Sequence, residues 1–137
     1  MFLQPRELKY KKEKKGKISG ISFESLNFGT FGIKALECGR INARQIEMAR
    51  RVISKRVKNS GKLWIRIFPH KPVTAKPNEV RMGKGKGSVS YWVAAIRPGK
   101  ILYEIEGISE TLAFKIFRTL SLKLPLKLKL ISAHSKL

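Results

Sequence analysis

The chain has 137 residues, a length typical of a single domain with one modest hydrophobic core. Its 30 Lys and Arg residues against 9 Asp and Glu residues give a formal net charge of +21, and such self-repulsion opposes folding unless a polyanion, first of all a nucleic acid, neutralises it. One cysteine, two histidines and scattered carboxylates provide no internal disulfide, no zinc-ligand spacing and no catalytic set, so we expect neither an enzyme nor a metal or cofactor site.

Residues 1 to about 20 are rich in cations and poor in apolar residues, so they carry too much like charge to fold alone. We predict an extended arm that becomes ordered on RNA, and a disordered, solvated tail is the alternative. The arm residues expected to bind RNA are Arg6, Lys9, Lys11, Lys12, Lys14, Lys15 and Lys17.

Residues 21–36 form an aromatic segment that is punctuated by Gly29 and Gly32, which predicts a strand region with a turn or bulge. Phe28 and Phe31 could stack on bases. We expect them in the core instead, because a small domain needs such side chains for its interior.

The clearest helical pattern begins after Asn42, the expected N-cap, with Gln45 reaching back in a variant of the capping box. The apolar stripe facing the core is Ile46, Ala49, Ile53 and Val57, and Asn59-Ser60-Gly61 should end the helix. The cations around the stripe are opposed by one acid, Glu47, which favours phosphate contact; they are Arg44, Arg50, Arg51, Lys55, Arg56 and Lys58.

The run 63–68 alternates as a strand, with Leu63, Ile65 and Ile67 on one side and Trp64, Arg66 and Phe68 on the other. Three prolines in residues 69–77, together with Lys71 and Lys76, then predict an extended segment that leads into a loop. Trp64, and Trp92 in the next strand, are expected in the core rather than as stacking platforms, because both lie inside strands.

The loop, Arg81-Met82-Gly83-Lys84-Gly85-Lys86-Gly87, sets cations between glycines, which predicts a mobile cationic finger between paired strands. Its spacing matches neither glycine-rich nucleotide motif, so nucleotide hydrolysis is not suggested. A strand over 88–96 follows, and Arg97-Pro98-Gly99-Lys100 fits a type II turn into a partner strand over 101–105. On that strand, Glu104 and Glu106 should pair with nearby Lys or Arg.

Ser109 is the expected N-cap of a second helix with an apolar face, which Leu124-Pro125 ends. The run 126–130 alternates strictly, which predicts a strand with leucines inward and lysines outward. The elements together predict an α+β domain over 21–137, with two helices packed on a mainly antiparallel sheet, after the basic arm over 1–20 and with the long Gly/Lys-rich loop inserted.

At this point the motifs match one known family. The sequence resembles the bacterial-type L16 (uL16) family of large-subunit ribosomal proteins over almost its whole length, and it departs from the family pattern chiefly from Phe114 onward. The stretches that carry the resemblance are Leu3-Gln4-Pro5, Ala43-Arg44-Gln45-Ile46-Glu47, Gly61-Lys62-Leu63-Trp64-Ile65-Arg66-Ile67-Phe68-Pro69, Arg81-Met82-Gly83-Lys84-Gly85-Lys86-Gly87 and Tyr91-Trp92-Val93.

The resemblance implies a structural ribosomal protein, not an enzyme, whose partners are large-subunit rRNA, tRNA in the aminoacyl site and other large-subunit proteins. It implies that the protein supports late assembly of the subunit and that the loop around Arg81 and Met82 points toward the tRNA and the peptidyl-transferase centre. The loop contacts would be Arg81, Lys84 and Lys86. The whole loop close to tRNA and the peptidyl-transferase centre would be Arg81, Met82, Gly83, Lys84, Gly85, Lys86 and Gly87. The rRNA contacts would be the arm cations with Arg44, Arg50, Arg51, Lys55, Arg66 and Lys71.

The start of the chain bears on the compartment. The family's own N-terminus begins close to Met1, so we expect no presequence and synthesis beside the ribosome that the protein joins. Abundant Lys, Ile, Phe and Ser fit an AT-rich genome, which favours a mitochondrion that encodes the protein; a plastid or a bacterial cytoplasm is the alternative.

Two rival functions belong to other classes. An RNA-modifying or RNA-cleaving enzyme would need a catalytic set that the sequence lacks. A module that binds a membrane surface would use the terminal stretch LKLPLKLKL, although no apolar run reaches the roughly 20 residues of a spanning helix.

Overall fold

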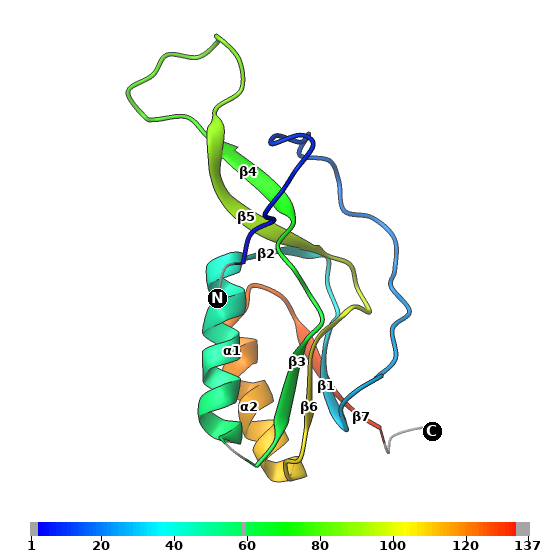
Figure 1. The fold of residues 1–137 in the computed structure, drawn as a ribbon. Coiled ribbons are helices and arrows are strands. Elements are labelled where there is room, and N and C mark those ends of the chain that lie inside the picture. Colours follow the sequence, from blue (N-terminus) through cyan, green and yellow to red (C-terminus); the bar gives the residue numbers. More distant parts are fainter. Residues whose placement is uncertain (1–2, 59, 134–137) are drawn as a thin grey trace.

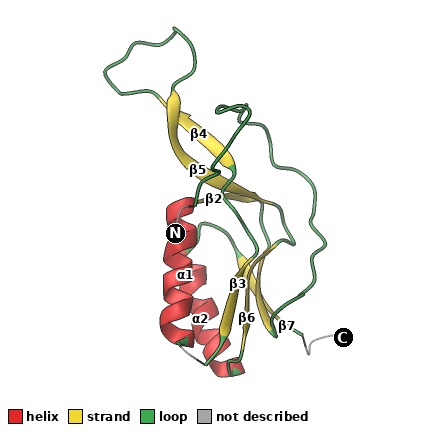
Figure 2. Cartoon of the chain, in the orientation of Figure 1, coloured by secondary structure: helices red, strands yellow, loops and turns green. Residues whose placement is uncertain are grey.

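The computed structural model describes residues 3–58 and 60–133. Within them the chain forms the predicted α+β fold, with two helices and seven strands in two antiparallel sheets (Figures 1 and 2). The strands are β1 (Phe31–Ala35), β2 (Gly39–Asn42), β3 (Lys62–Ile65), β4 (Lys71–Ala75), β5 (Ser88–Ile96), β6 (Ile101–Glu106) and β7 (Leu128–Ser132), and the helices are α1 (Ala43–Val57) and α2 (Glu110–Lys123). In this part of the chain, neither helix is long and apolar enough to cross a membrane.

The larger sheet has the strand order β3-β6-β1-β7, and both helices lie against one of its faces (Figure 2). Strand β6 is buried from Ile101 to Ile105, because the helices cover one face and the segment before β1 covers the other. The hydroxyl of Tyr103 donates to the carbonyl oxygen of Ile46 at 3.3 Å, which ties the sheet to α1. The core therefore lies between this sheet and the helices.

Helix α1 follows its sequence prediction closely. The N–H of Asn42 donates to Gln45 Oε1 at 2.9 Å, and Asn42 Oδ1 accepts from the N–H of Arg44 at 3.2 Å, so the predicted capping box is present. The predicted stripe is buried, as its four members are the buried residues of the helix. The helix ends at Val57, and Lys58 takes a positive φ of 50°; Asn59 of the predicted stop lies outside the described residues.

Helix α2 and strand β7 also occur as predicted, although Ser109 makes no side-chain capping bond. Its hydroxyl lies 3.1 Å from that of Thr111 instead. Leu124, Leu126 and Leu128 are buried in the core. The rival membrane-surface reading thus loses the apolar face on which it depended. Residues 134–137 of the predicted domain lie outside the described residues.

The smaller sheet has the order β2-β5-β4 and extends beyond the helices, carrying the loop at its tip (Figure 1). The loop joins paired strands as predicted, since Val73 is opposite Tyr91 and Ala75 is opposite Ser88. The proline-rich segment before the loop, predicted only as extended, contains strand β4. Pro72 fits there because β4 is an edge strand, where a missing N–H costs no ladder bond.

The predicted hairpin of residues 88–105 is wrong, although its turn is right. Gly99 has a φ of +89°, and the N–H of Lys100 donates to the carbonyl of Arg97 at 3.2 Å. However, β5 pairs with β2 and β4, whereas β6 pairs with β1 and β3. The turn therefore passes the chain from one sheet to the other. The N–H of Gly99 donates to the carbonyl of Ala35 at 2.7 Å, so the end of β1 lies beside the turn that leads into β6.

The predicted strand region over 21–36 is also mostly wrong, because only Phe31–Ala35 is a strand. Before it the chain runs as a loop across the larger sheet, with Phe28 55% exposed. The ring of Phe28 stacks on Trp64, with centroids 5.9 Å apart and an interplanar angle of 18°. Trp92 is half-buried, and none of these three rings belongs to the hydrophobic core, contrary to the prediction.

Candidate nucleic-acid interface

The loop between β4 and β5 presents its cations to solvent. Residues 81–86 are all exposed, and Met82 has 97% of its surface accessible. Gly83 and Gly85 take φ values of +102° and +90°, a region that L side chains rarely adopt and that favours glycine at both positions. Lys84 between them also has a positive φ, of 53°. Lys76 Nζ donates to the carbonyl oxygen of Gly83, so the loop is closed on itself. Its tip is therefore a defined turn that offers Arg81 and Lys84 outward.

The basic arm lies against the base of this loop. Lys12 Nζ donates to the carbonyl of Lys86 at 3.0 Å, and Lys86 Nζ donates to the carbonyl of Glu13. Arg40 of β2 donates to the carbonyls of Lys15 and Gly16 at 2.8 and 3.0 Å. The arm contains no helix or strand among residues 3–20, so side chains of the folded domain hold it through its backbone carbonyls.

These contacts enclose a cationic pocket of about 200 Å³ between the arm and the smaller sheet. Its charged lining comes from three predicted segments and one unpredicted residue: Lys14, Lys15, Lys71, Lys86 and Arg40, with Glu13. Arm, strand and loop residues that are distant in sequence thus meet in one place. The remaining arm cations are exposed: Arg6, Lys9, Lys11, Lys12 and Lys17.

The four cations of α1 that are predicted to contact rRNA fall into two groups. Arg44 and Lys55 are exposed, as a phosphate contact requires. Arg50 and Arg51 instead share Glu47, with Nε to carboxylate oxygen distances of 2.8 and 3.0 Å. The hydrogen bonds from Arg50 and then Arg51 lower the pKa of Glu47 to about 2, so this carboxylate stays charged at neutral pH. The side chain of Arg51 is still 75% exposed.

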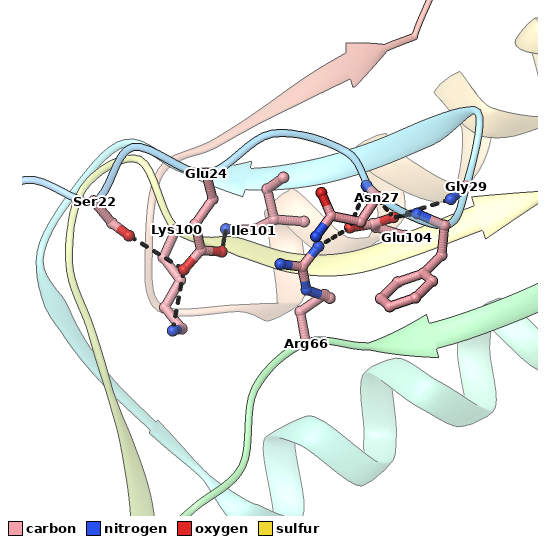
Figure 3. A network of polar contacts seen from close by, with 9 residues as sticks. Ser22, Glu24, Asn27, Gly29, Arg66, Lys100, Ile101 and Glu104 are labelled. Atoms are coloured by element: carbon pink, nitrogen blue, oxygen red, sulfur yellow. Dashed lines mark hydrogen bonds and ion pairs between the residues drawn. The ribbon is translucent and has the colours of Figure 1, made fainter.

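Arg66, another predicted RNA contact, is committed to an internal ion pair with Glu104 (Figure 3). Only 20% of the Arg66 side chain is exposed, and its guanidinium lies 5.7 Å from the centroid of the Phe28 ring. Glu104 is fully buried. The prediction that Glu104 pairs with a cation is confirmed. The prediction did not include the burial of Glu104, nor that Arg66 would be held in an internal ion pair.

Glu104 organises the loop that crosses the larger sheet. Its Oε2 accepts from the N–H groups of Phe28 at 2.7 Å, Gly29 at 2.9 Å and Asn27 at 3.2 Å. Burial raises the pKa of Glu104, but the hydrogen bonds from Gly29, Phe28, Arg66 and Asn27 outweigh burial and hold the pKa below its ordinary value. Glu104 is therefore a buried carboxylate that accepts hydrogen bonds from three backbone N–H groups and from Arg66.

A second carboxylate fixes the same loop nearer its start (Figure 3). Glu24 accepts from the N–H of Ile101 at 3.0 Å, from Ser22 Oγ at 3.2 Å and from Lys100 Nζ at 3.3 Å. Burial raises the pKa of Glu24, and the bonds from Ile101 and Lys100 lower it further than burial raises it. Two glutamates thus attach this loop to strand β6.

The sequence did not assign Arg40 to the site, and it did not predict the burial of Glu104. Arg40 has no pattern that singles it out, because its role depends on the arm folding back onto β2. Glu104 did carry a signal, since it is the one charged residue inside the apolar run Ile101–Ile105. A charge at such a position has to be paired and hydrogen-bonded.

Exposed cations on the loop, arm and α1, together with acids held in internal contacts, define a basic domain suited to a polyanion. Among the described residues, no group of three or more His, Cys, Asp or Glu side chains could hold a metal ion. The fold and surface are therefore those of a small basic α+β domain with its exposed cations on the loop, the arm and α1.

The family can be named from comparison with known proteins. Residues 5–131 match the family described as Ribosomal protein L16p/L10e. The chain is 57% identical over 132 residues to "Large ribosomal subunit protein uL16" of Buchnera aphidicola subsp. Cinara cedri (strain Cc), covering 96% of this chain and 97% of the relative. It is 56% identical over 126 residues to the protein of the same name from Wigglesworthia glossinidia brevipalpis, covering 91% and 93%. The chain therefore belongs to the L16p/L10e family of ribosomal proteins, as the resemblance predicted.

Proposed function

We propose that this ribosomal protein is a structural constituent of the large subunit that binds rRNA and directs its 81–87 loop toward tRNA in the aminoacyl site, near the peptidyl-transferase centre. It also supports late assembly of the subunit. The observation that carries the proposal is the exposed cationic loop, which a sheet holds beyond the body of the domain (Figure 1). Such a projecting element reaches a second RNA while the domain rests on the first.

The contacts with rRNA are made to phosphates, which fix position and displace counterions without reading sequence. Arg44 and Lys55 on α1 are free to do this. The pocket lined by Lys14, Lys15, Lys71, Lys86 and Arg40 is concave, and it concentrates cations from three segments. A phosphate in it would hold the arm against the smaller sheet. RNA binding and ordering of the arm are therefore one event in this proposal.

Within the loop the contacts divide by position. Arg81 and Lys84 face solvent at the tip and hold phosphates of tRNA or of neighbouring rRNA. Lys86 donates to the arm, so it positions the base of the loop. A Cβ placed on Gly83 or Gly85 has nothing within 4 Å, so open space surrounds the tip on the side where tRNA would approach.

The paired arginines contribute less to RNA affinity than the free cations. Arg50 and Arg51 share the charge of Glu47, and Arg66 is neutralised by Glu104. Each still has guanidinium donors beyond those used internally. Their proposed rRNA contacts are consequently secondary, with Arg51 the best placed because it is the most exposed of the three.

The relatives named above are bacterial, which agrees with a bacterial-type ribosome and with the bacterial cytoplasm that was the alternative for the compartment. The mitochondrial location, with the protein encoded by the organelle, stays a prediction. Sedimenting ribosomes from the source cells at high salt, and probing each large-subunit fraction for the chain, decides between these addresses. Absence from every large subunit would overturn the proposed function itself.

The orientation of the loop is tested by site-specific crosslinking. A photoreactive side chain at Met82 costs no packing, because the native side chain is 97% exposed. It is expected to crosslink tRNA in ribosomes with an occupied aminoacyl site. The matched control is the same group at Leu122, which is 83% exposed on α2. Crosslinking of tRNA from Leu122, with none from Met82, would reverse the proposed orientation.

A further inference from the structure

The two helices form a groove with an unusual charge. It measures about 800 Å³ and is lined by six cations, by Thr119 and by an apolar pair, Val52 and Leu112. The cations come from both helices and the residue after α1: Lys55, Arg56, Lys58, Lys115, Arg118 and Lys123. No acidic residue is among the described lining residues. The groove therefore carries more uncompensated positive charge than the pocket beside the arm, which contains Glu13.

The groove extends beyond the interface described above. Three of its cations, Lys55, Arg56 and Lys58, are among the residues predicted to contact phosphate. The other three belong to no predicted contact: Lys115, Arg118 and Lys123. The helices lie at the opposite end of the molecule from the loop (Figure 1). One continuous RNA surface over the loop and arm therefore does not account for this cluster of charge.

The lining indicates which part of an RNA the groove fits. Base recognition usually needs an aromatic platform, and none of the nine lining residues is aromatic. The cations of α2 extend from Lys115 to Lys123, roughly 12 Å at 1.5 Å per residue. That length spans more than one phosphate along a nucleic-acid strand. A sugar-phosphate backbone therefore fits this lining, which offers an unstacked base no aromatic ring.

The groove is also held in shape before any ligand binds. Arg56 Nη1 donates to the carbonyl of Lys115 at 2.6 Å and so joins the two helices across the groove. Val52 lies on α1 and Leu112 on α2, and both pack against the core. A preformed site loses less entropy on binding than one that must be assembled.

We propose that the α1–α2 groove is a second RNA-binding site that takes the phosphate backbone of a double-helical RNA segment. The chain would then bridge two RNA segments, one at the arm and loop and one at the helices. The inference rests on the proposed rRNA-binding function, and it adds a site, a ligand class and a bridging role to it.

Binding stoichiometry tests the second site directly. The probe is an RNA duplex of about 10 base pairs, roughly one helical turn, titrated into the full chain by isothermal calorimetry and native mass spectrometry. The wild-type chain is expected to take two duplexes, and the variant K115Q/R118Q is expected to take one. The control K62Q/K129Q removes the same charge from exposed strand residues and should still take two duplexes.

Salt dependence gives a second, quantitative measure. Losing two phosphate contacts lowers the log–log salt slope of the affected site by about 1.8, which is a factor of roughly 12 in affinity between about 50 and about 200 mM salt. The salt slope of K115Q/R118Q should therefore be smaller than that of the wild-type chain, whereas the salt slope of K62Q/K129Q should equal it. All three proteins should unfold at the same temperature, because the substituted side chains are exposed.

The outcomes separate the two proposals. One duplex per chain for all three proteins, with equal salt slopes, overturns the second site but leaves rRNA binding intact. No duplex bound by the wild-type chain overturns both. A 12-residue polyglutamate peptide that binds wild type more tightly than the duplex, and loses affinity in K115Q/R118Q, would assign the groove to an acidic protein partner and overturn the RNA assignment.

Discussion

Replacing Glu104 with Gln tests whether a buried carboxylate holds the loop before β1. The substitution keeps the size of the side chain and removes its charge. If the amide oxygen takes the place of Oε2, it can still accept from Phe28 and Gly29. The amide nitrogen then faces the guanidinium of Arg66, so a donor opposes a donor where an ion pair stood.

The expected cost follows from these contacts. Removing one charge from a buried ion pair typically costs about 3–5 kcal/mol, because the other charge is left uncompensated. Here 20% of the Arg66 side chain is exposed, so water restores part of its hydration. The surviving N–H bonds to the amide oxygen reduce the loss further. We expect the free energy of unfolding to fall by about 2–3 kcal/mol at neutral pH.

The pH dependence has a definite sign. The pKa of Glu104 in the folded chain lies below its ordinary value of 4.5, so the charged form is the one that folding favours. Its stabilising contribution is complete above the unfolded-state pKa and is lost as the pH falls toward the folded-state pKa. The difference between wild type and E104Q should therefore be full at neutral pH and shrink as the pH falls below 4.5.

Urea unfolding at several pH values measures this difference, and amide exchange locates it at the N–H groups of Phe28 and Gly29. The matched control is E106Q on the same strand face, because Glu106 is exposed. It should change stability by less than about 0.5 kcal/mol. An E104Q loss no larger than that of E106Q, or unchanged exchange at Phe28, would refute the reasoning.

The other predictions concern the loop and the first helix. Removing both tip cations, in R81A/K84A, should slow tRNA accommodation by roughly three- to tenfold in single-turnover kinetics, which is about the effect of one or two phosphate contacts. The unfolding temperature should stay the same. Normal accommodation in this variant would contradict the role of the tip cations. Gly87→Ala should lower the free energy of unfolding by about 1–3 kcal/mol in urea titration, since the new Cβ collides with the carbonyl oxygen of Ala75. An unchanged urea midpoint would contradict the close approach of Gly87 to Ala75. Asn42→Ala should cost about 1 kcal/mol and speed amide exchange in the first turn of α1, and equal exchange there would mean that the cap contributes nothing.

Features fixed by local rules were predictable from the sequence. Helix α1 was found because a capping pair at Asn42 and Gln45 and an apolar stripe at helical spacing are both contained within the helix and its cap. The strict alternation of leucine and lysine located β7, only two residues later than expected. In these elements the contacts that decide the structure involve near neighbours in sequence.

Features decided by long-range contacts were not predictable. The aromatic, glycine-rich segment before β1 reads as a strand, but its N–H groups bond to Glu104, 75 to 77 residues away. The bond to the N–H of Phe28 fixes the backbone beside a ring that is 55% exposed and stacks on the half-buried Trp64. The turn at Pro98-Gly99 follows local chemistry, whereas the strands that it joins pair with the distant β1, β2, β3 and β4.

The candidate site divides in the same way. The exposed cations of the loop tip could be assigned from Arg81-Met82-Gly83-Lys84, because glycine alternation is a local signal. The pocket at its base could not be assigned, since it depends on contacts such as Lys12 with Lys86, which are 74 residues apart. The groove between the helices likewise needs α1 and α2 placed side by side before its charge is apparent.

The placement of the acids explains how a chain with a net charge of +21 can fold and still present cationic surfaces. Four glutamates form ion pairs inside the described structure: Glu24, Glu37, Glu47 and Glu104. Two of them attach the loop before β1, and Glu47 lies on α1 between two arginines. Because these acids stabilise the fold at fixed points, they do not neutralise the loop tip or the helix groove. An incoming phosphate at those two places therefore displaces counterions and water, and it breaks no internal ion pair.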